Sequence, residues 1–194
     1  MPQDPLSHHL TTMAYNNAWA NHRLLAACAR LDPAEFVAPR SGFFPSIRAT
    51  LNHILAVDCF YVDAFEREAR DEPPHPRIAE FFDVPEPCDN CQAVQAAQRA
   101  VDAKLIAYCQ TLNDASLSRV VTILRPSGAQ HETRTRLLAH VFEHQIHHRG
   151  QVHAMLSSTA VPPPQLDEFF CTMDAPLRRQ DFAEMGLSEA DIWT

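Results

Sequence analysis

The chain has 194 residues, of which 46% are hydrophobic and 21% charged, a composition that is typical of one globular domain and excludes wholesale disorder. The formal net charge of -8 argues against a nucleic-acid partner, and four glycines are too few to favour glycine-rich phosphate loops. No apolar run approaches the roughly 20 residues of a membrane-spanning helix, and the first residues do not resemble a signal peptide, so we expect a cytoplasmic protein without a membrane partner.

Four stretches carry apolar residues at helical spacing, and prolines separate them. They cover residues 5–31, 46–70, 90–112 and 133–158. Asp32-Pro33 ends the first stretch, and Ser46 is a plausible N-cap of the second. Four helices of this length predict an all-α four-helix bundle over residues 1–160.

Two segments outside these helices also carry structural signals. Residues 119–124 are β-branched and precede the turn sequence Pro126-Ser127-Gly128, which predicts a short hairpin before the last helix. The tail after Pro164 is too apolar to remain in solvent. We therefore expect residues 161–194 to form an extension of the same domain that packs across the bundle or onto a partner subunit.

The fourth predicted helix carries a column of histidines. His140, His144 and His148 share one face at spacing i, i+4 and i+8, and His147 lies one turn after His144. Two imidazoles one turn apart can bind one metal ion, whereas the outer pair is roughly 11 to 12 Å apart along the axis. This spacing leaves the pairs 140/144, 144/147 and 144/148 open, and a further ligand must come from another helix.

His53 is the best candidate for that further ligand, because it lies in an otherwise apolar segment of the second predicted helix. His22 has polar neighbours and is expected on an exposed face. The histidines nearest termini and loops are expected to be ordinary surface residues. These are His8, His9, His75 and His131.

The motifs resemble those of the DinB-like (damage-inducible, YfiT-related) metalloenzymes. The first is His144-x-x-His147-His148-Arg149-Gly150-Gln151, and the second is Leu51-x-His53-Ile54 followed by Asp58. The first predicted helix adds Asn17-x-Trp19-Ala20-Asn21, and the tail adds Asp174-x-Pro176-Leu177-Arg178-Arg179. The resemblance therefore covers nearly the whole chain.

The resemblance implies a four-helix bundle, often a homodimer, with one divalent metal ion, commonly zinc or nickel. By position, the implied ligands are His53, His144 and His148, and His140 and His147 then become residues of the surrounding pocket. Three neutral imidazoles leave metal positions free, which is the arrangement of a catalytic site. Histidine ligands alone do not select the metal.

Several neighbouring residues have predicted supporting roles. Asp58 is a candidate to orient a ligand, and Asn17 and Asn21 either do the same or hydrogen-bond between helices. Arg149 is expected to pair with a buried carboxylate rather than with a substrate carboxylate. Gly150 lies in the middle of a helix, where we expect another segment to approach its backbone closely.

Two other kinds of site are disfavoured. A zincin peptidase requires Glu directly after its first metal-binding His, but Gln145 follows His144 and Glu143 precedes it. Cys88-x-x-Cys91 is a lone pair without a second motif, so neither a zinc ribbon nor a thioredoxin-like site is supported. We do not expect the six cysteines to form structural disulfides in a reducing cytosol.

Three functions remain. The resemblance implies a thiol-dependent S-transferase, in which the metal activates a low-molecular-weight thiol cosubstrate for attack on a small electrophilic substrate. A metal-dependent hydrolase would use metal-bound hydroxide instead, with His140, His147 or Glu143 as the nearest candidate bases. A non-catalytic, stress-induced binding module would need no metal chemistry.

Overall fold

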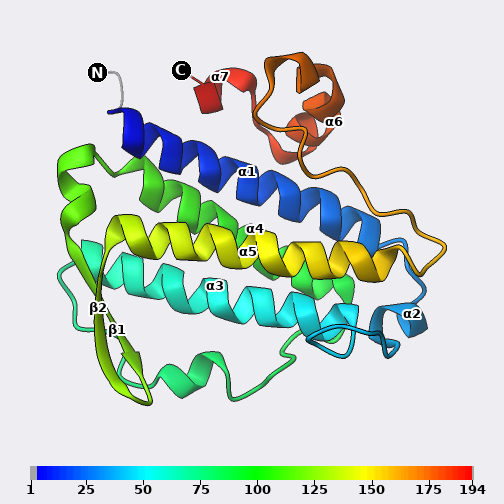
Figure 1. Cartoon of the computed structure of the whole chain (residues 1–194), viewed down its shortest axis with the longest axis horizontal. Coiled ribbons are helices and arrows are strands. Elements are labelled where there is room, and N and C mark those ends of the chain that lie inside the picture. The colour runs from blue at the N-terminus through cyan, green and yellow to red at the C-terminus, as the bar shows by residue number, and fades with distance from the viewer. Residues whose placement is uncertain (1–3, 194) are drawn as a thin grey trace.

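The computed structural model describes residues 4–193 and confirms the predicted helical bundle (Figure 1). The four long helices are α1 (Pro5–Cys28), α3 (Ile47–Ala69), α4 (Cys91–Gln110) and α5 (Arg134–Leu156). Each lies within one of the predicted stretches. The hydroxyl of Ser46 accepts a hydrogen bond from the backbone N–H of Ala49, so the predicted N-cap of α3 is also confirmed. Among the described helices, none combines the length and apolarity needed to span a membrane.

The order of the helices around the bundle differs from their order in the chain. α1 packs against α4 and α5, and α3 packs against the same two helices, so α1 and α3 lie at opposite corners (Figure 1). The C-terminal ends of α1 and α5 share an apolar cluster with the N-terminal ends of α3 and α4. The first pair of helices therefore runs in one direction and the second pair in the other.

Long connections make this arrangement possible. Between α1 and α3 lies the short helix α2 (Pro33–Val37), which begins at the proline that was expected only to end the preceding helix. Residues 70–90 run back along the bundle, because α3 and α4 are parallel, and include a 3-10 helix at Ile78–Phe81. Both connections reach the end of α3 that carries His53.

The predicted hairpin consists of β1 (Val120–Arg125) and β2 (Gly128–Thr133), which pair antiparallel. Arg125 pairs with Gly128, so Pro126 and Ser127 form the loop, and Gly128 adopts the positive φ of 121° that glycine tolerates. Val121 and Ile123 on β1 are buried against the bundle core. A 3-10 helix at Asp114–Ser118 precedes the hairpin.

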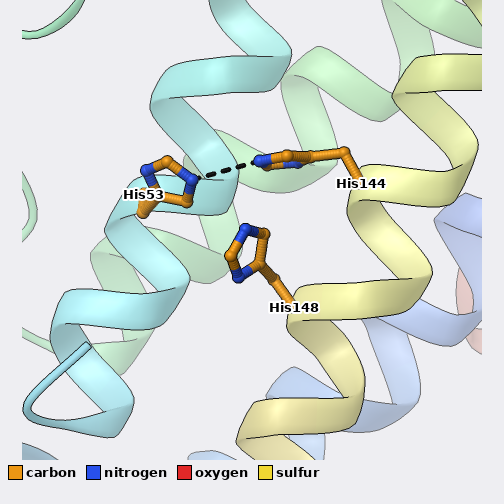
Figure 2. A group of neighbouring side chains, drawn as sticks. All are labelled: His53, His144 and His148. Carbon is orange, nitrogen blue, oxygen red and sulfur yellow. Dashed lines mark hydrogen bonds between the residues drawn. The ribbon is translucent and has the colours of Figure 1, made fainter. Parts of the chain in front are cut away.

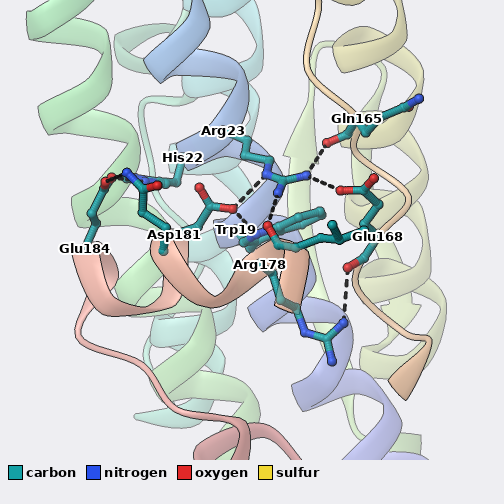
Figure 3. Close-up of polar contacts among 10 residues, drawn as sticks. Trp19, His22, Arg23, Gln165, Glu168, Arg178, Asp181 and Glu184 are labelled. Atoms are coloured by element: carbon teal, nitrogen blue, oxygen red, sulfur yellow. Dashed lines mark hydrogen bonds and ion pairs between the residues drawn. The ribbon is translucent and has the colours of Figure 1, made fainter. Parts of the chain in front are cut away.

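The C-terminal segment packs on the outer face of α1. Of the two predicted arrangements, packing across the bundle is therefore the one found, rather than packing onto a partner subunit. It contains a 3-10 helix (Thr172–Asp174), α6 (Ala175–Met185) and α7 (Glu189–Trp193). Trp19 is fully buried against Phe169 from this segment. Arg23 donates to Asp181, to Glu168 and to two backbone carbonyls of the segment, and its guanidinium lies over the Trp19 ring (Figure 3).

Candidate metal centre

Three histidines from two helices converge on one face of the bundle. His53 projects from α3, and His144 and His148 project from successive turns of α5 (Figure 2). The Nε2 atoms of His53 and His144 are 3.1 Å apart, and the ligand atoms of all three residues lie within 4.8 Å of one another. Of the three pairs that the sequence left open, the structure thus brings 144/148 together with His53.

The spacing of these nitrogens suits one metal ion. Zinc–imidazole bonds of about 2.0–2.1 Å place two nitrogens of the same ion about 3.0–3.4 Å apart. The 3.1 Å separation of His53 and His144 already lies in this range. The remaining separations are at most 4.8 Å, and the imidazoles would have to close them to share one ion.

The three imidazoles are neutral at physiological pH. Burial, and then the neighbouring His148, lower the pKa of His53 to about 4. Burial and then the surrounding histidines lower the pKa of His144 to about 3. Burial also lowers the pKa of His148. Since only a neutral imidazole can donate a lone pair to a metal, the electrostatics of the site favour binding.

Gln151 holds His148 in the orientation that a metal ligand needs. Nδ1 of His148 lies 2.9 Å from Oε1 of Gln151, and the side-chain amide nitrogen of Gln151 lies 3.0 Å from Nε2 of His147. The amide oxygen is an acceptor, so the proton of His148 is assigned to Nδ1 and the lone pair to Nε2. Gln151 was quoted in the sequence motif without a role, although its i, i+3 spacing from His148 was a signal.

His144 has no such support. Its Nδ1 is enclosed and has no hydrogen-bond partner among the described residues, while its Nε2 faces His53. Metal-binding histidines ordinarily donate through their second ring nitrogen. Of the three candidate ligands, His148 is therefore the one whose Nδ1 hydrogen-bonds to a side-chain amide.

An apolar recess adjoins His53. The Phe44 ring lies 4.4 Å from the His53 ring and 5.6 Å from the His148 ring, measured between centroids. A cavity of about 320 Å³ opens beside it, between α3 and the two long connections. Its lining includes Phe44, Pro45, Ala49, His53, Ala56, Phe82, Val84 and Pro85. The sequence analysis missed this recess, because loop residues carry no periodic signal.

The three predicted catalytic side chains occupy different surroundings. His140 is exposed, with its ring 5.3 Å from Tyr61 and 6.3 Å from His144. His147 is exposed, and its ring lies 4.8 Å from the His148 ring. Glu143 is exposed on α5 and makes no hydrogen bond or ion pair within residues 4–193. Of the three, the two histidines therefore lie beside the candidate ligands.

Asp58, a candidate to orient a metal ligand, does not do so in the structure. It is 1% exposed, and its Oδ2 accepts hydrogen bonds from the side-chain amides of Gln98 and Gln145, while its Oδ1 has no partner in the described part of the chain. The physical reason is its position five residues after His53, which directs it into the bundle interior rather than toward the histidines. Burial, and then Asp102, raise its pKa to about 7.

The remaining polar residues of the interior link the helices rather than the histidines. Asn17 and Asn21 both donate to Asp102, so the simpler of their two predicted roles is the one found. Nη1 of Arg149 donates to Asn17, Asn21 and Gln145. Asp58 and Asp102 act on Arg149 through their charge, but neither carboxylate pairs with it directly, so the predicted ion pair is replaced by amide contacts.

Two further expectations were wrong. A Cβ atom built on Gly150 meets nothing within 4 Å, so no segment among residues 4–193 approaches this glycine closely. His22 does not lie on an exposed face, because α6 covers it and Glu184 lies 3.1 Å from its Nε2 (Figure 3). The sequence of α1 alone could not reveal that His22 is covered, since the covering residues lie about 160 positions later in the chain.

The six cysteines all have free thiols in this structure. Cys88 is half-buried, and Cys91 is buried and lies 3.6 Å from the Leu25 carbonyl oxygen, to which its thiol donates. Burial raises the pKa of Cys91 to about 11, so its thiol stays protonated at neutral pH. The pair therefore lacks the thiolate character of a redox or metal site.

Comparison with known proteins places these residues in a family context. The model of the DinB family matches residues 6–179, which is nearly the whole chain. Protein DinB of Bacillus subtilis (strain 168) is 24% identical over 141 residues, a match that covers 72% of this chain and 80% of that protein. The match includes both helices that carry the three histidines.

Proposed function

The chain belongs to the DinB family, and from this premise we propose that it is a divalent-metal-dependent enzyme that transfers a low-molecular-weight thiol to a small electrophile. The observation that carries the proposal is the convergence of His53, His144 and His148 beside an apolar recess. Three imidazoles would hold the ion and leave coordination positions free for a reactant. Zinc and nickel are the metals that the family resemblance favours, and a ligand set of histidines is compatible with both.

The metal-binding step is supported by the chemistry of the donors themselves. All three imidazoles are neutral, and the hydrogen bond to Gln151 leaves Nε2 of His148 free to donate its lone pair. A divalent ion bound there supplies Lewis acidity, which lowers the pKa of a thiol and makes it a thiolate nucleophile at neutral pH. In this proposal, His140 or His147 would receive the thiol proton.

The recess beside His53 suits the electrophile. Its walls are aromatic, aliphatic and proline side chains, and its one carboxylate, Glu86, is engaged by Arg48. Such a surface holds an apolar or aromatic body by burial and excludes water from the reacting atoms. In the transfer, the sulfur–carbon bond forms, the bond from carbon to the leaving group breaks, and the thiol proton passes to a histidine or to solvent.

The test is conjugation of 1-chloro-2,4-dinitrobenzene with glutathione, bacillithiol and mycothiol, each with zinc-loaded or nickel-loaded protein. We expect product with at least one thiol, loss of product in His53→Ala and retention in His131→Ala, an exposed histidine on β2. Failure of all three thiols would contradict the transfer reaction. Metal-dependent cleavage of esters or amides without a thiol would instead favour the hydrolase.

A further inference from the structure

The glycine in the middle of α5 has no packing explanation. Glycine destabilises a helix interior relative to alanine, and the chain has only four glycines. Gly150 is exposed, and a Cβ atom at this position would enter open space. The glycine therefore keeps a volume free that any other side chain would enter.

That volume belongs to a cavity between α1, α5 and the C-terminal segment. The cavity measures about 450 Å³, within the usual size range of small-molecule sites. Apolar side chains form most of its walls, and Gly150 and Arg149 lie side by side along it. The apolar lining consists of Ala20, Ile146, Leu166, Phe169 and Phe170.

Arg149 gives this cavity an unused binding group. Arg149 is 4% exposed, and its guanidinium has no carboxylate within ion-pair distance in the described part of the chain. Only Nη1 forms hydrogen bonds, all to neutral amides. Nε and Nη2 form none with residues 4–193, and Arg149 is one of the residues that line the cavity.

The other polar groups around the cavity are few. Asn16 lines it and makes no hydrogen bond to another residue of the range 4–193. Nε2 of His153 is engaged by the carbonyl of Pro164. Asp167 also lines the cavity, is exposed and forms no ion pair with a described residue. Solvent screens this exposed carboxylate far more than it screens the buried guanidinium.

We propose that the cavity between α1, α5 and residues 165–170 is a second binding site, which takes a small carboxylate with an aromatic or aliphatic body. The free Nε and Nη2 of Arg149 form the two-pronged donor that matches the geometry of a carboxylate. The apolar body would lie over Gly150 and against Phe169 and Phe170. A ligand carboxylate would also supply the ion-pair partner that the buried guanidinium lacks.

This site is separate from the metal centre. The three histidines face α3, whereas the cavity faces α1 and the C-terminal segment, and the two share no lining residue. Binding here therefore does not depend on the proposed transfer reaction. The two proposals can fail independently.

The experiment measures phenylacetate binding to the full-length protein by isothermal titration calorimetry, with phenethylamine as a probe of similar shape and opposite charge. We expect saturable binding of phenylacetate and at least tenfold weaker binding of phenethylamine. Gly150→Leu should fill the cavity and weaken phenylacetate binding at least tenfold. Leucine favours the helix and would enter open space at this position. The melting temperature of the Gly150→Leu variant should therefore equal or exceed that of the wild type.

Ala139→Leu is the matched control, since Ala139 is exposed on the same helix and lies outside the cavity. It should bind phenylacetate as the wild type does, and both variants should keep the metal content of the wild type. Binding that is equal in wild type and Gly150→Leu, preference for the amine, or no binding of either probe would overturn the proposal. A wild-type dimer that Gly150→Leu converts to a monomer would also overturn it, because a second copy would then cover the cavity.

Discussion

His148 and Gln151 lie one helical turn apart on α5, and Nδ1 of His148 is 2.9 Å from Oε1 of Gln151. This contact fixes the imidazole so that Nε2 faces His53 and His144. It also explains why an amide follows the histidines in the sequence at this spacing. Support of this kind ordinarily determines how tightly a metal site binds its ion.

Replacement of Gln151 by leucine should therefore weaken metal binding by about 10- to 100-fold, since His148 loses the acceptor that fixes its ring. Gln151→Glu keeps an acceptor oxygen at this position and should retain affinity close to that of the wild type. Competition for zinc with a chromophoric chelator measures both constants. Equal affinity of the leucine variant and the wild type would show that the contact does not support the site.

The apolar recess should decide which electrophiles react. Ala56 lines the cavity beside His53. The change Ala56→Leu should raise KM for an aromatic electrophile by about tenfold, because each added methylene removes room for the substrate body. Metal content should not change. Steady-state kinetics combined with elemental analysis would detect the opposite result, an unchanged KM, which would place substrate elsewhere.

The buried carboxylate of Asp58 should make stability depend on pH. Its pKa is about 7 in the folded protein and about 4 in an unfolded chain, so the folded state retains a proton that the unfolded state has lost between these values. The free energy of unfolding should therefore fall as pH rises from about 4 to 7, by up to about 1.4 kcal/mol per pH unit from this group. Below this window the contribution is fully present.

Asp58→Asn removes this titration and preserves the acceptor oxygen for Gln98 and Gln145. Urea unfolding of metal-free protein at several pH values should show a stability difference between variant and wild type that grows in favour of asparagine as pH rises. The histidine titrations are common to both proteins and cancel in the difference. Parallel stability curves would contradict the shifted pKa.

Arg23 should hold the C-terminal segment on the bundle. It bonds to Asp181 and Glu168 and lies over Trp19 (Figure 3). Arg23→Gln should lower the free energy of unfolding by about 1–3 kcal/mol and expose residues 161–193 to limited proteolysis. Arg77→Gln, which removes an exposed pair with Glu80, should change stability by less than about 0.5 kcal/mol. Equal proteolysis of both variants would argue against this role.

Local patterns in the sequence were sufficient to predict the helices. Apolar periodicity and the Ser46 cap located α3, and the β-branched run before Pro126 located the hairpin. The short helices of the C-terminal segment were missed, because they are stabilised by contacts with α1 and not by a periodicity of their own. Arg178, for example, is 1% exposed through contacts within the segment that no local pattern specifies.

The candidate site was predictable only where its residues share a helix or a family motif. The spacing of His144 and His148 placed them on one face, and the apolar neighbours of His53 made it the best candidate for the further ligand. The family resemblance then selected 144/148 from the pairs that the spacing left open. Phe44 was not predicted, since it reaches the site from a connection whose path depends on the tertiary fold. The role expected for Gly150 was wrong for a similar reason, because sequence reveals a missing side chain but not what lies opposite it.

The most direct test of the account is elemental analysis of protein purified without an affinity tag or added metal. We predict about one divalent ion per chain in the wild type, and its loss in His53→Ala, His144→Ala and His148→Ala. His131→Ala, which removes an exposed histidine far from the site in the chain, should retain the ion. A wild type that carries no metal and takes none up on titration, or histidine variants that keep it, would contradict the three-histidine centre.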